Sequence, residues 1–112
     1  ALRDRVAVYD IAGPLFFGAA QKAMGSLGVI AGRIKVLIIR LDHVPVMDAT
    51  GLVALESAIA TLSKHDCTTI LIGLQRQPLV LIKRARFETR SWKLVIRPDL
   101  PAALATAREL VG

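Results

Sequence analysis

The sequence predicts an α/β domain with a mainly parallel β-sheet of about four strands covered by about four helices. Short runs of apolar and β-branched residues alternate along the chain with longer stretches that have helical periodicity. This alternation of strands and helices implies parallel pairing through right-handed crossovers. One run, residues 35–41, is almost continuously apolar, which is typical of a strand covered on both faces.

Four segments are predicted to be strands. Residues 6–11 combine apolar and β-branched side chains in an alternating pattern. Residues 35–41 form the buried strand described above, and residues 68–72 form the third strand. Residues 94–96 form a short last strand.

Four segments are predicted to be helices. The first spans residues 15–27 and follows Pro14, whose missing N–H costs nothing at a helix start. The second begins at Asp48, the third covers residues 78–87, and the last begins at Asp99, which can serve as its N-cap. The apolar stripes expected to face the core are Phe16, Ala20, Ala23 and Leu27 in the first helix, Leu52, Leu55, Ile59 and Leu62 in the second, and Leu100, Leu104, Ala107 and Val111 in the last.

The length of 112 residues suits one domain with its own core, and residues 1–112 are predicted to form a single domain. The longest apolar stretch, residues 11–20, is interrupted by Gly13 and Pro14, whereas a membrane-spanning helix needs about 20 consecutive apolar residues. Neither a membrane span nor a signal peptide is therefore expected. Cys67 is the only cysteine, which excludes an internal disulfide and a multi-cysteine metal site and fits a reducing cytoplasm.

The net charge of +6 is unevenly placed, because residues 76–97 contain seven Lys and Arg residues against Glu88 alone. Such a block indicates either an anionic neighbour (lipid headgroups, a nucleotide or an acidic protein) or a solvated face that keeps the domain in solution. Nucleic acid is not expected as a partner, because the few aromatic residues form no stacking platform. The candidate contacts for an anion or nucleotide are Arg76, Lys83, Arg84 and Arg86.

No catalytic residue, metal site or cofactor is predicted. His43 and His65 lie 22 residues apart, with no companion ligand at metal-binding spacing. Cys67 follows His65 closely enough for a nucleophilic pair, but packing is the ordinary role of a lone thiol at the start of a strand. The glycines of residues 25–32 follow a predicted helix and lack a terminal Gly-Lys-Ser/Thr, so they do not match a phosphate-binding loop.

The most informative segment is residues 46–52, where the chain leaves a predicted strand and enters an amphipathic helix. Asp48 and Thr50 lie at the helix start, where unpaired N–H groups and the helix dipole favour an anion or a phosphorylated side chain. In the alternative interpretation Asp48 is only an N-cap, Thr50 is a neutral first-turn residue, and Gly51 is a small residue that permits close packing.

At this segment the chain resembles the STAS family, named for sulfate transporters and anti-sigma factor antagonists. The family places Asp-Ser-Ser-Gly or a relative at this helix start, and here the sequence is Asp-Ala-Thr-Gly at residues 48–51. The resemblance extends from about Val6 to Leu110 in the order of elements. In the antagonists the second hydroxyl of this motif accepts phosphate from a kinase, which implies Thr50 as the corresponding position.

Two stretches resemble the sulfate-permease (SulP) transporter branch, namely residues 13–20 and residues 40–52. This branch implies a non-enzymatic regulatory domain at the C-terminal, cytoplasmic end of a longer membrane transporter, at the inner face of the cell membrane. The implied partners are the membrane transport unit of the same polypeptide, a regulatory protein or nucleotide, and a second copy through the parent transporter. The expected working surface is the helix start at Asp48, Thr50 and Gly51, together with a preceding interaction loop that contains His43, Pro45 and Met47.

Two alternative functions are also compatible with the sequence. The chain can be a free-standing anti-sigma factor antagonist that is switched by phosphorylation of Thr50. It can also be a nucleotide-binding sensor whose basic residues between Arg76 and Arg97 contact the phosphates.

Overall fold

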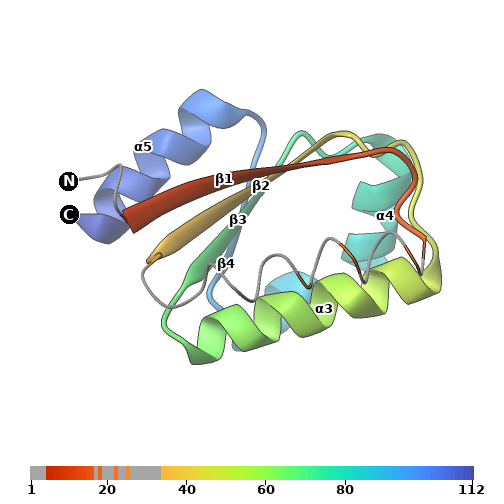
Figure 1. Ribbon diagram of the computed structural model, residues 1–112, viewed down its shortest axis with the longest axis horizontal. Helices are drawn as coiled ribbons and strands as arrows, with labels where there is room; N and C mark the ends of the chain where they lie inside the picture. Colours follow the sequence, from red (N-terminus) through yellow and green to blue (C-terminus); the bar gives the residue numbers. More distant parts are fainter. Residues whose placement is uncertain (1–4, 17, 19–21, 23–24, 26–33) are drawn as a thin grey trace.

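Four parallel strands form one sheet in the order β1-β2-β3-β4 (Figure 1). The computed structural model describes residues 5–16, 18, 22, 25 and 34–112. The strands are β1 (Val6–Ala12), β2 (Val36–His43), β3 (Thr68–Ile72) and β4 (Leu94–Arg97), and the helices are α3 (Ala49–Lys64), α4 (Arg76–Arg84), the short 3-10 helix η1 (Phe87–Thr89) and α5 (Leu100–Val111). The predicted parallel α/β architecture is therefore confirmed.

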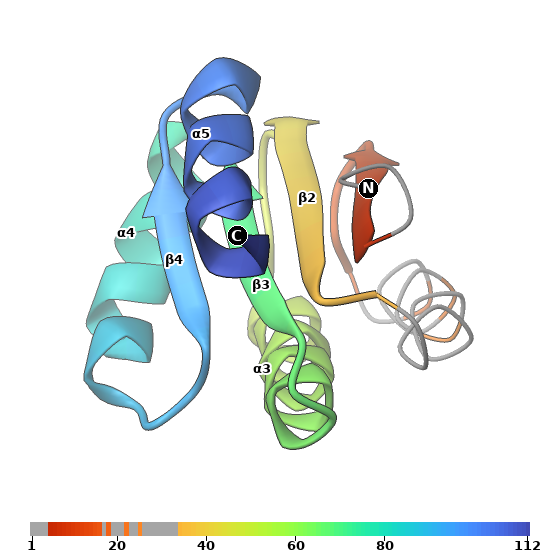
Figure 2. The same ribbon diagram turned by 90° about the vertical axis from the view of Figure 1, so that its left-hand side faces the viewer.

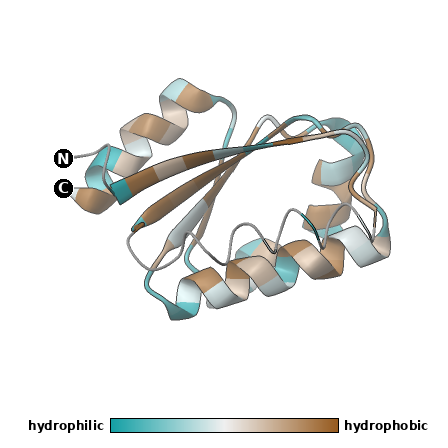
Figure 3. Ribbon diagram, in the orientation of Figure 1, coloured by the Kyte–Doolittle hydropathy of each residue, from teal (hydrophilic) through white to brown (hydrophobic). Residues whose placement is uncertain are grey.

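Helices cover both faces of the sheet, with α3 and α4 on one side and α5 on the other (Figures 1 and 2). Successive side chains of a strand point to opposite faces. In β2, Leu37 and Ile39 accordingly pack with α3 and α4, whereas Ile38 packs with α5. The prediction that this strand is covered on both faces is confirmed, because its first four residues are all buried, and Figure 3 shows that this first part of β2 is apolar.

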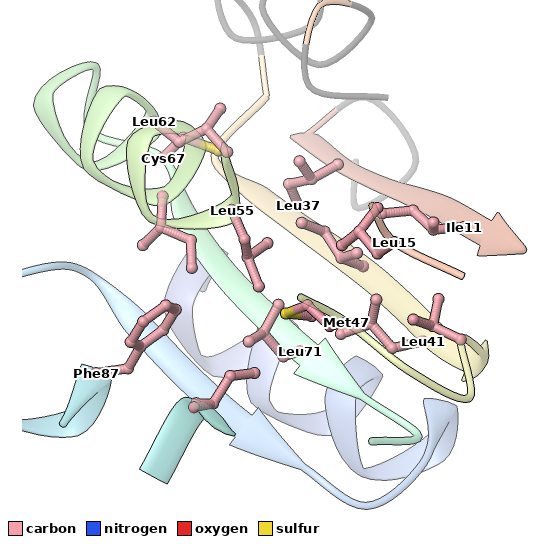
Figure 4. Close-up of a cluster of buried hydrophobic side chains, with 14 residues drawn as sticks. Ile11, Leu15, Leu37, Leu41, Met47, Leu55, Leu62, Cys67, Leu71 and Phe87 are labelled. Carbon is pink, nitrogen blue, oxygen red and sulfur yellow. The ribbon is translucent and has the colours of Figure 1, made fainter. Parts of the chain in front are cut away.

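The larger core lies between the sheet and α3 (Figure 4). Three residues of the predicted stripe of α3, Leu55, Ile59 and Leu62, are fully buried there, while Leu52 is partly buried. On the opposite face of the sheet the buried residues of α5 are small, so the helix lies close to the strands. These residues are Ala103 and Ala107.

The third predicted helix, residues 78–87, is wrong at its C-terminal end. Helix α4 ends at Arg84, because Arg86 adopts a left-handed conformation with φ of 57° that an α-helix cannot contain. The chain then turns into η1 and buries Phe87 under the sheet, where its ring meets Trp92 edge to face at a centroid distance of 5.3 Å.

The first predicted helix, residues 15–27, lies mostly outside the described residues, including Ala20, Ala23 and Leu27 of its expected stripe. Phe16 is described, and its predicted place in the core is wrong, because its side chain is 46% exposed. Its neighbour Leu15 is the buried residue instead, and it pairs with Met47 in an isolated parallel bridge.

The segments that follow β1, β2 and β3 meet at the C-terminal end of the parallel strands. Gly13 N–H donates to the carbonyl of His43 at 2.8 Å, which ties the exit of β1 to the exit of β2. Gly73 follows β3 with a positive φ of 68°, and a Cβ there would overlap the Asp42 carboxylate, so the position requires glycine. Asp48, immediately before α3, lies beside the chain that leaves β1, because its N–H donates to the Leu15 carbonyl.

None of the helices in the described part of the chain is long and apolar enough to cross a membrane.

Candidate functional site

Asp48 is the N-cap of α3. Its backbone is extended (φ −98°, ψ 179°), and its Oδ1 accepts hydrogen bonds from the Gly51 N–H and the Thr50 hydroxyl, both at 2.7 Å. These two bonds lower the pKa of Asp48 below its usual value of 3.8, and the bond from Gly51 has the larger effect. A carboxylate with a lowered pKa is a weak base at neutral pH, so Asp48 is poorly suited to remove a proton from Thr50.

Thr50 is exposed in the first turn of α3, and its hydroxyl donates to Asp48. The hydroxyl oxygen keeps lone pairs for another donor. The helix N-terminus next to it is the place where backbone N–H groups and the dipole favour negative charge. The geometry therefore allows a phosphoryl group or an acidic partner at Thr50, and it also satisfies the simpler capping role.

Gly51 lies beneath the chain that leaves β1. The Leu15 N–H donates to the Val46 carbonyl at 2.9 Å, and the Leu15 carbonyl accepts from the Asp48 N–H at 3.4 Å. A Cβ on Gly51 would overlap the Leu15 carbonyl oxygen and would lie 3.3 Å from Met47 Cγ. The absence of a side chain at Gly51 is what allows this close approach.

The interaction loop expected before α3 is only partly accessible. His43, the last residue of β2, and Pro45 are exposed, but the side chain of Met47 is 1% exposed and packs in the larger core (Figure 4). The expectation that Met47 contacts a partner is therefore wrong. Its apolar side chain is held inside by Leu15 and Gly51 on the neighbouring backbone.

Two glutamines that the sequence pattern did not indicate fix this loop. The side-chain amide of Gln77 exchanges two hydrogen bonds with the backbone of Met47, and Gln75 Nε2 donates to the Asp42 carbonyl at 2.7 Å. The only signal in the sequence was the presence of two glutamines among the three residues before Pro78, at the start of a predicted helix.

The four basic residues expected to contact an anion do not converge. Arg76 begins α4 while Lys83 and Arg84 lie in its last turn, about 10–12 Å further along the axis. Lys83 and Arg86 share a surface hollow of about 250 Å³ that also contains Glu88. The structure therefore brings together two of the four residues, beside an acidic side chain.

Other basic side chains of residues 76–97 have partners within the domain. Arg90 pairs with Glu56 at 2.9 Å and lies 4.9 Å from the Trp92 ring centroid. Arg97 Nε donates to the Thr106 hydroxyl at 3.0 Å. These contacts reduce the number of cations that face solvent without a partner.

The histidines and the cysteine do not form a reactive group. His65 is the C-cap of α3, and its Nδ1 lies 2.9 Å from the Thr61 carbonyl oxygen. Cys67 is buried, and burial raises the pKa of its thiol, which makes it a poor nucleophile at neutral pH. Within residues 5–16 and 34–112, no three His, Cys, Asp or Glu side chains are grouped so that they could hold a metal ion.

A family model for the STAS domain matches residues 2–102. Among curated proteins, YvdB of Bacillus subtilis (strain 168), named as a sulfate transporter, is 31% identical over 80 residues. That match covers 70% of this chain and 15% of YvdB, so the chain spans only a small part of this relative.

Solved structures agree with this match. A sulfate transporter family protein from Wolinella succinogenes has 36% identity and a TM-score of 0.78, with coverage of 95% of this chain and 87% of that one. The STAS domain of a SulP transporter from Vibrio cholerae has 28% identity and a TM-score of 0.76, with coverage of 96% and 84%. The anti-sigma factor antagonist SpoIIAA, in its unphosphorylated form, shares the fold at 16% identity and a TM-score of 0.68, with coverage of 90% and 87%.

Proposed function

The chain belongs to the STAS domain family, and from this premise we propose that it is the regulatory or interaction domain of a sulfate-permease-type anion transporter and performs no chemistry itself. The observation that carries the proposal is the match to a solved sulfate transporter family protein over 95% of the chain at 36% identity. The match to a SulP transporter STAS domain over 96% of the chain supports the same branch.

The proposed partner is the membrane transport unit of the same polypeptide, with the domain at the cytoplasmic face of the cell membrane. A homodimer then forms through the parent transporter. The short coverage of YvdB, 15% of its length, is consistent with a domain that is one part of a larger protein.

The proposed working surface is the start of α3 with the exposed part of the loop before it. Thr50, His43 and Pro45 are exposed there. The backbone of residues 47–51 is fixed by the Asp48 cap and by the Gln77 amide, so a partner that contacts the helix start meets a surface that needs little ordering on binding.

Fractionation of the source cells tests this proposal. An antibody against the domain is applied to washed membranes and to the soluble fraction. We expect a band several times larger than 12.1 kDa in the membrane fraction. A band near 12 kDa in the soluble fraction alone would overturn the assignment to a transporter.

Phosphorylation of Thr50 is the second candidate function, favoured by the exposure of this hydroxyl beside a helix N-terminus. Incubation with a cognate kinase and ATP, followed by mass spectrometry, tests it. Phosphate on the parent chain but not on Thr50→Val would support the switch, and phosphate on neither would remove it. Thr61→Val is the matched control on the same helix.

Nucleotide binding has weaker support, because only Lys83 and Arg86 of the expected contacts share a hollow. Calorimetry with ATP and GTP tests it, and the absence of heat at millimolar nucleotide would remove it.

A further inference from the structure

A second surface hollow lies at the N-terminal end of the parallel strands, opposite the proposed working surface. Its volume is about 450 Å³. Its walls come from segments far apart in the sequence, namely the start of β2, the turn before β3, the start of β4 and the last turn of α5. Small-molecule sites typically have volumes of about 300–1,000 Å³, so this hollow has room for a small ligand.

Two lysines, each immediately before a different strand, converge on one carboxylate in this hollow. Lys35 Nζ lies 3.3 Å from Asp66 Oδ2, and Lys93 Nζ pairs with Asp66 Oδ1. The three groups together carry a net charge of +1. Each ammonium has three N–H donors, and its bond to Asp66 uses one of them. The side chains of Lys35 and Lys93 are 52% and 48% exposed, so the remaining donors can reach a ligand.

Asp66 is placed so that it brings the two lysines together. Its backbone is left-handed, with φ of 61°, and its N–H donates to the Ser63 carbonyl at 3.1 Å. The Lys93 N–H donates to the Ser63 hydroxyl at 3.0 Å, which fixes the start of β4 against the same turn. The turn that carries Asp66 and the start of β4 are therefore fixed against each other on the cationic side of the hollow.

The other walls of the hollow are mainly apolar, with the polar residue Thr68 among them. Trp92, Leu94, Val95 and Leu110 line them, and Leu110 is 49% exposed although it lies in the last turn of α5. The indole of Trp92 makes a T-shaped contact with the Phe87 ring, and the Arg90 guanidinium lies 4.9 Å from its centroid. An apolar ligand group that contacts Trp92 and these aliphatic side chains would remove apolar surface from water, which favours binding.

We propose that this hollow binds a small organic anion with an apolar tail, whose carboxylate contacts Lys35 and Lys93 and whose tail lies against Trp92 and Leu110. An inorganic anion would use the lysines but would leave the apolar walls in water. A neutral apolar molecule would use the walls but would gain nothing from the two ammonium groups. The combination of both surfaces selects a molecule that carries both features.

Trp92 is the only tryptophan of the chain, so its fluorescence reports directly on this hollow. The protein is titrated with sodium octanoate at low ionic strength, with sodium acetate and 1-octanol as matched ligands that lack the tail or the charge. We expect a saturable change in Trp92 fluorescence with octanoate, and no comparable change with acetate or octanol at the same concentrations. An equal response to acetate or octanol, or no saturable response to octanoate, would overturn the proposal.

Charge substitutions separate this site from general attraction to a basic protein. The double variant Lys35→Gln/Lys93→Gln should weaken octanoate binding by about fivefold or more, since exposed ion pairs contribute modestly to affinity. The control Lys64→Gln/Arg108→Gln removes the same amount of charge at exposed positions outside the hollow and should bind octanoate as the parent does. Equal affinities of the two double variants would overturn the site.

A third variant, Leu110→Ser, tests the apolar wall without changing charge and should also weaken octanoate binding. If this variant binds octanoate with the affinity of the parent, the apolar tail does not lie against Leu110. Vesicles of phosphatidylglycerol distinguish a lipid surface from a free anion. A fluorescence change with vesicles and none with octanoate would also count against the proposal.

Discussion

The side-chain amide of Gln77 and the backbone of Met47 form a reciprocal pair of hydrogen bonds. The Met47 N–H donates to Gln77 Oε1, and Gln77 Nε2 donates to the Met47 carbonyl, both at 2.9 Å. The two residues are 30 positions apart in the sequence. Because Met47 immediately precedes the N-cap Asp48, the first turn of α4 fixes the backbone that leads into α3.

Gln77→Ala should destabilise the fold. It removes both partners of the Met47 backbone, and a partly buried donor or acceptor without a partner costs about 1–3 kcal/mol. Urea unfolding should show this decrease in the free energy of unfolding. Gln75→Ala is the control, because Gln75 makes a single hydrogen bond to the Asp42 carbonyl at an exposed position. If Gln77→Ala lowers the free energy of unfolding no more than Gln75→Ala does, the Gln77 amide does not stabilise the backbone at Met47.

Gly51→Ala should be more destabilising than a usual exchange within a helix. Alanine normally stabilises a helix relative to glycine by about 1 kcal/mol, but here its Cβ would overlap the Leu15 carbonyl oxygen. Overpacking of this kind costs about 1–3 kcal/mol, so we expect a net decrease in the free energy of unfolding. Gly18→Ala is the control, since a Cβ there meets nothing within 4 Å. Equal thermal midpoints for the two variants would refute the close approach.

Regular elements were the part of this fold that the sequence predicted well. The third strand was predicted at residues 68–72, as observed, because a short apolar run preceded by two threonines has few alternatives. Three residues of the stripe expected in α3, Leu55, Ile59 and Leu62, are buried as helical periodicity requires.

Irregular segments were predicted less well, for physical reasons that local patterns do not contain. The left-handed residue that follows α4 is Arg86 and not a glycine or asparagine, so the residue type at that position does not indicate the end of the helix. The burial of Met47 depends on contacts with Leu15 and Gln77, which are distant in sequence. The hollow beside Lys35 and Lys93 likewise depends on how separate strands are aligned.

Acid should weaken the start of α3 through Asp48. The pKa of Asp48 is lower in the folded chain than its usual value of 3.8, so ionised Asp48 stabilises the fold above that value. This contribution disappears as the pH falls through the lowered pKa. Urea midpoints measured between pH 6 and pH 2 should therefore fall less steeply at the acid end for Asp48→Asn, which can still cap the helix.

The bond from Thr50 is the second cause of the shift at Asp48. Thr50→Val removes that bond and leaves the Gly51 N–H bond in place, so its acid dependence should lie between those of the parent and Asp48→Asn. Identical acid profiles for the parent and Asp48→Asn would show that the charge of Asp48 does not stabilise the cap.

Cys67 should react slowly with alkylating reagents in the folded chain. Its side chain is buried beneath α3, and burial raises the pKa of the thiol, so little thiolate is present at neutral pH (Figure 4). Mass spectrometry after iodoacetamide treatment should show little modification at pH 7.5 and complete modification in concentrated urea. Equal rates in the two conditions would contradict the burial of this thiol.

Thr50→Asp should change a contact of the working surface without unfolding the domain. The new carboxylate lies near that of Asp48, but the N-terminal dipole of α3 offsets part of their repulsion, typically by about 0.3–1 kcal/mol. We therefore expect a free energy of unfolding within about 1 kcal/mol of the parent value, and altered transport when the substitution is made in the parent transporter. Thr61→Asp is the control, because it adds the same charge at an exposed position further along α3. If the parent transporter has the same transport rate with Thr50→Asp as with Thr61→Asp, the start of α3 is not the regulatory surface.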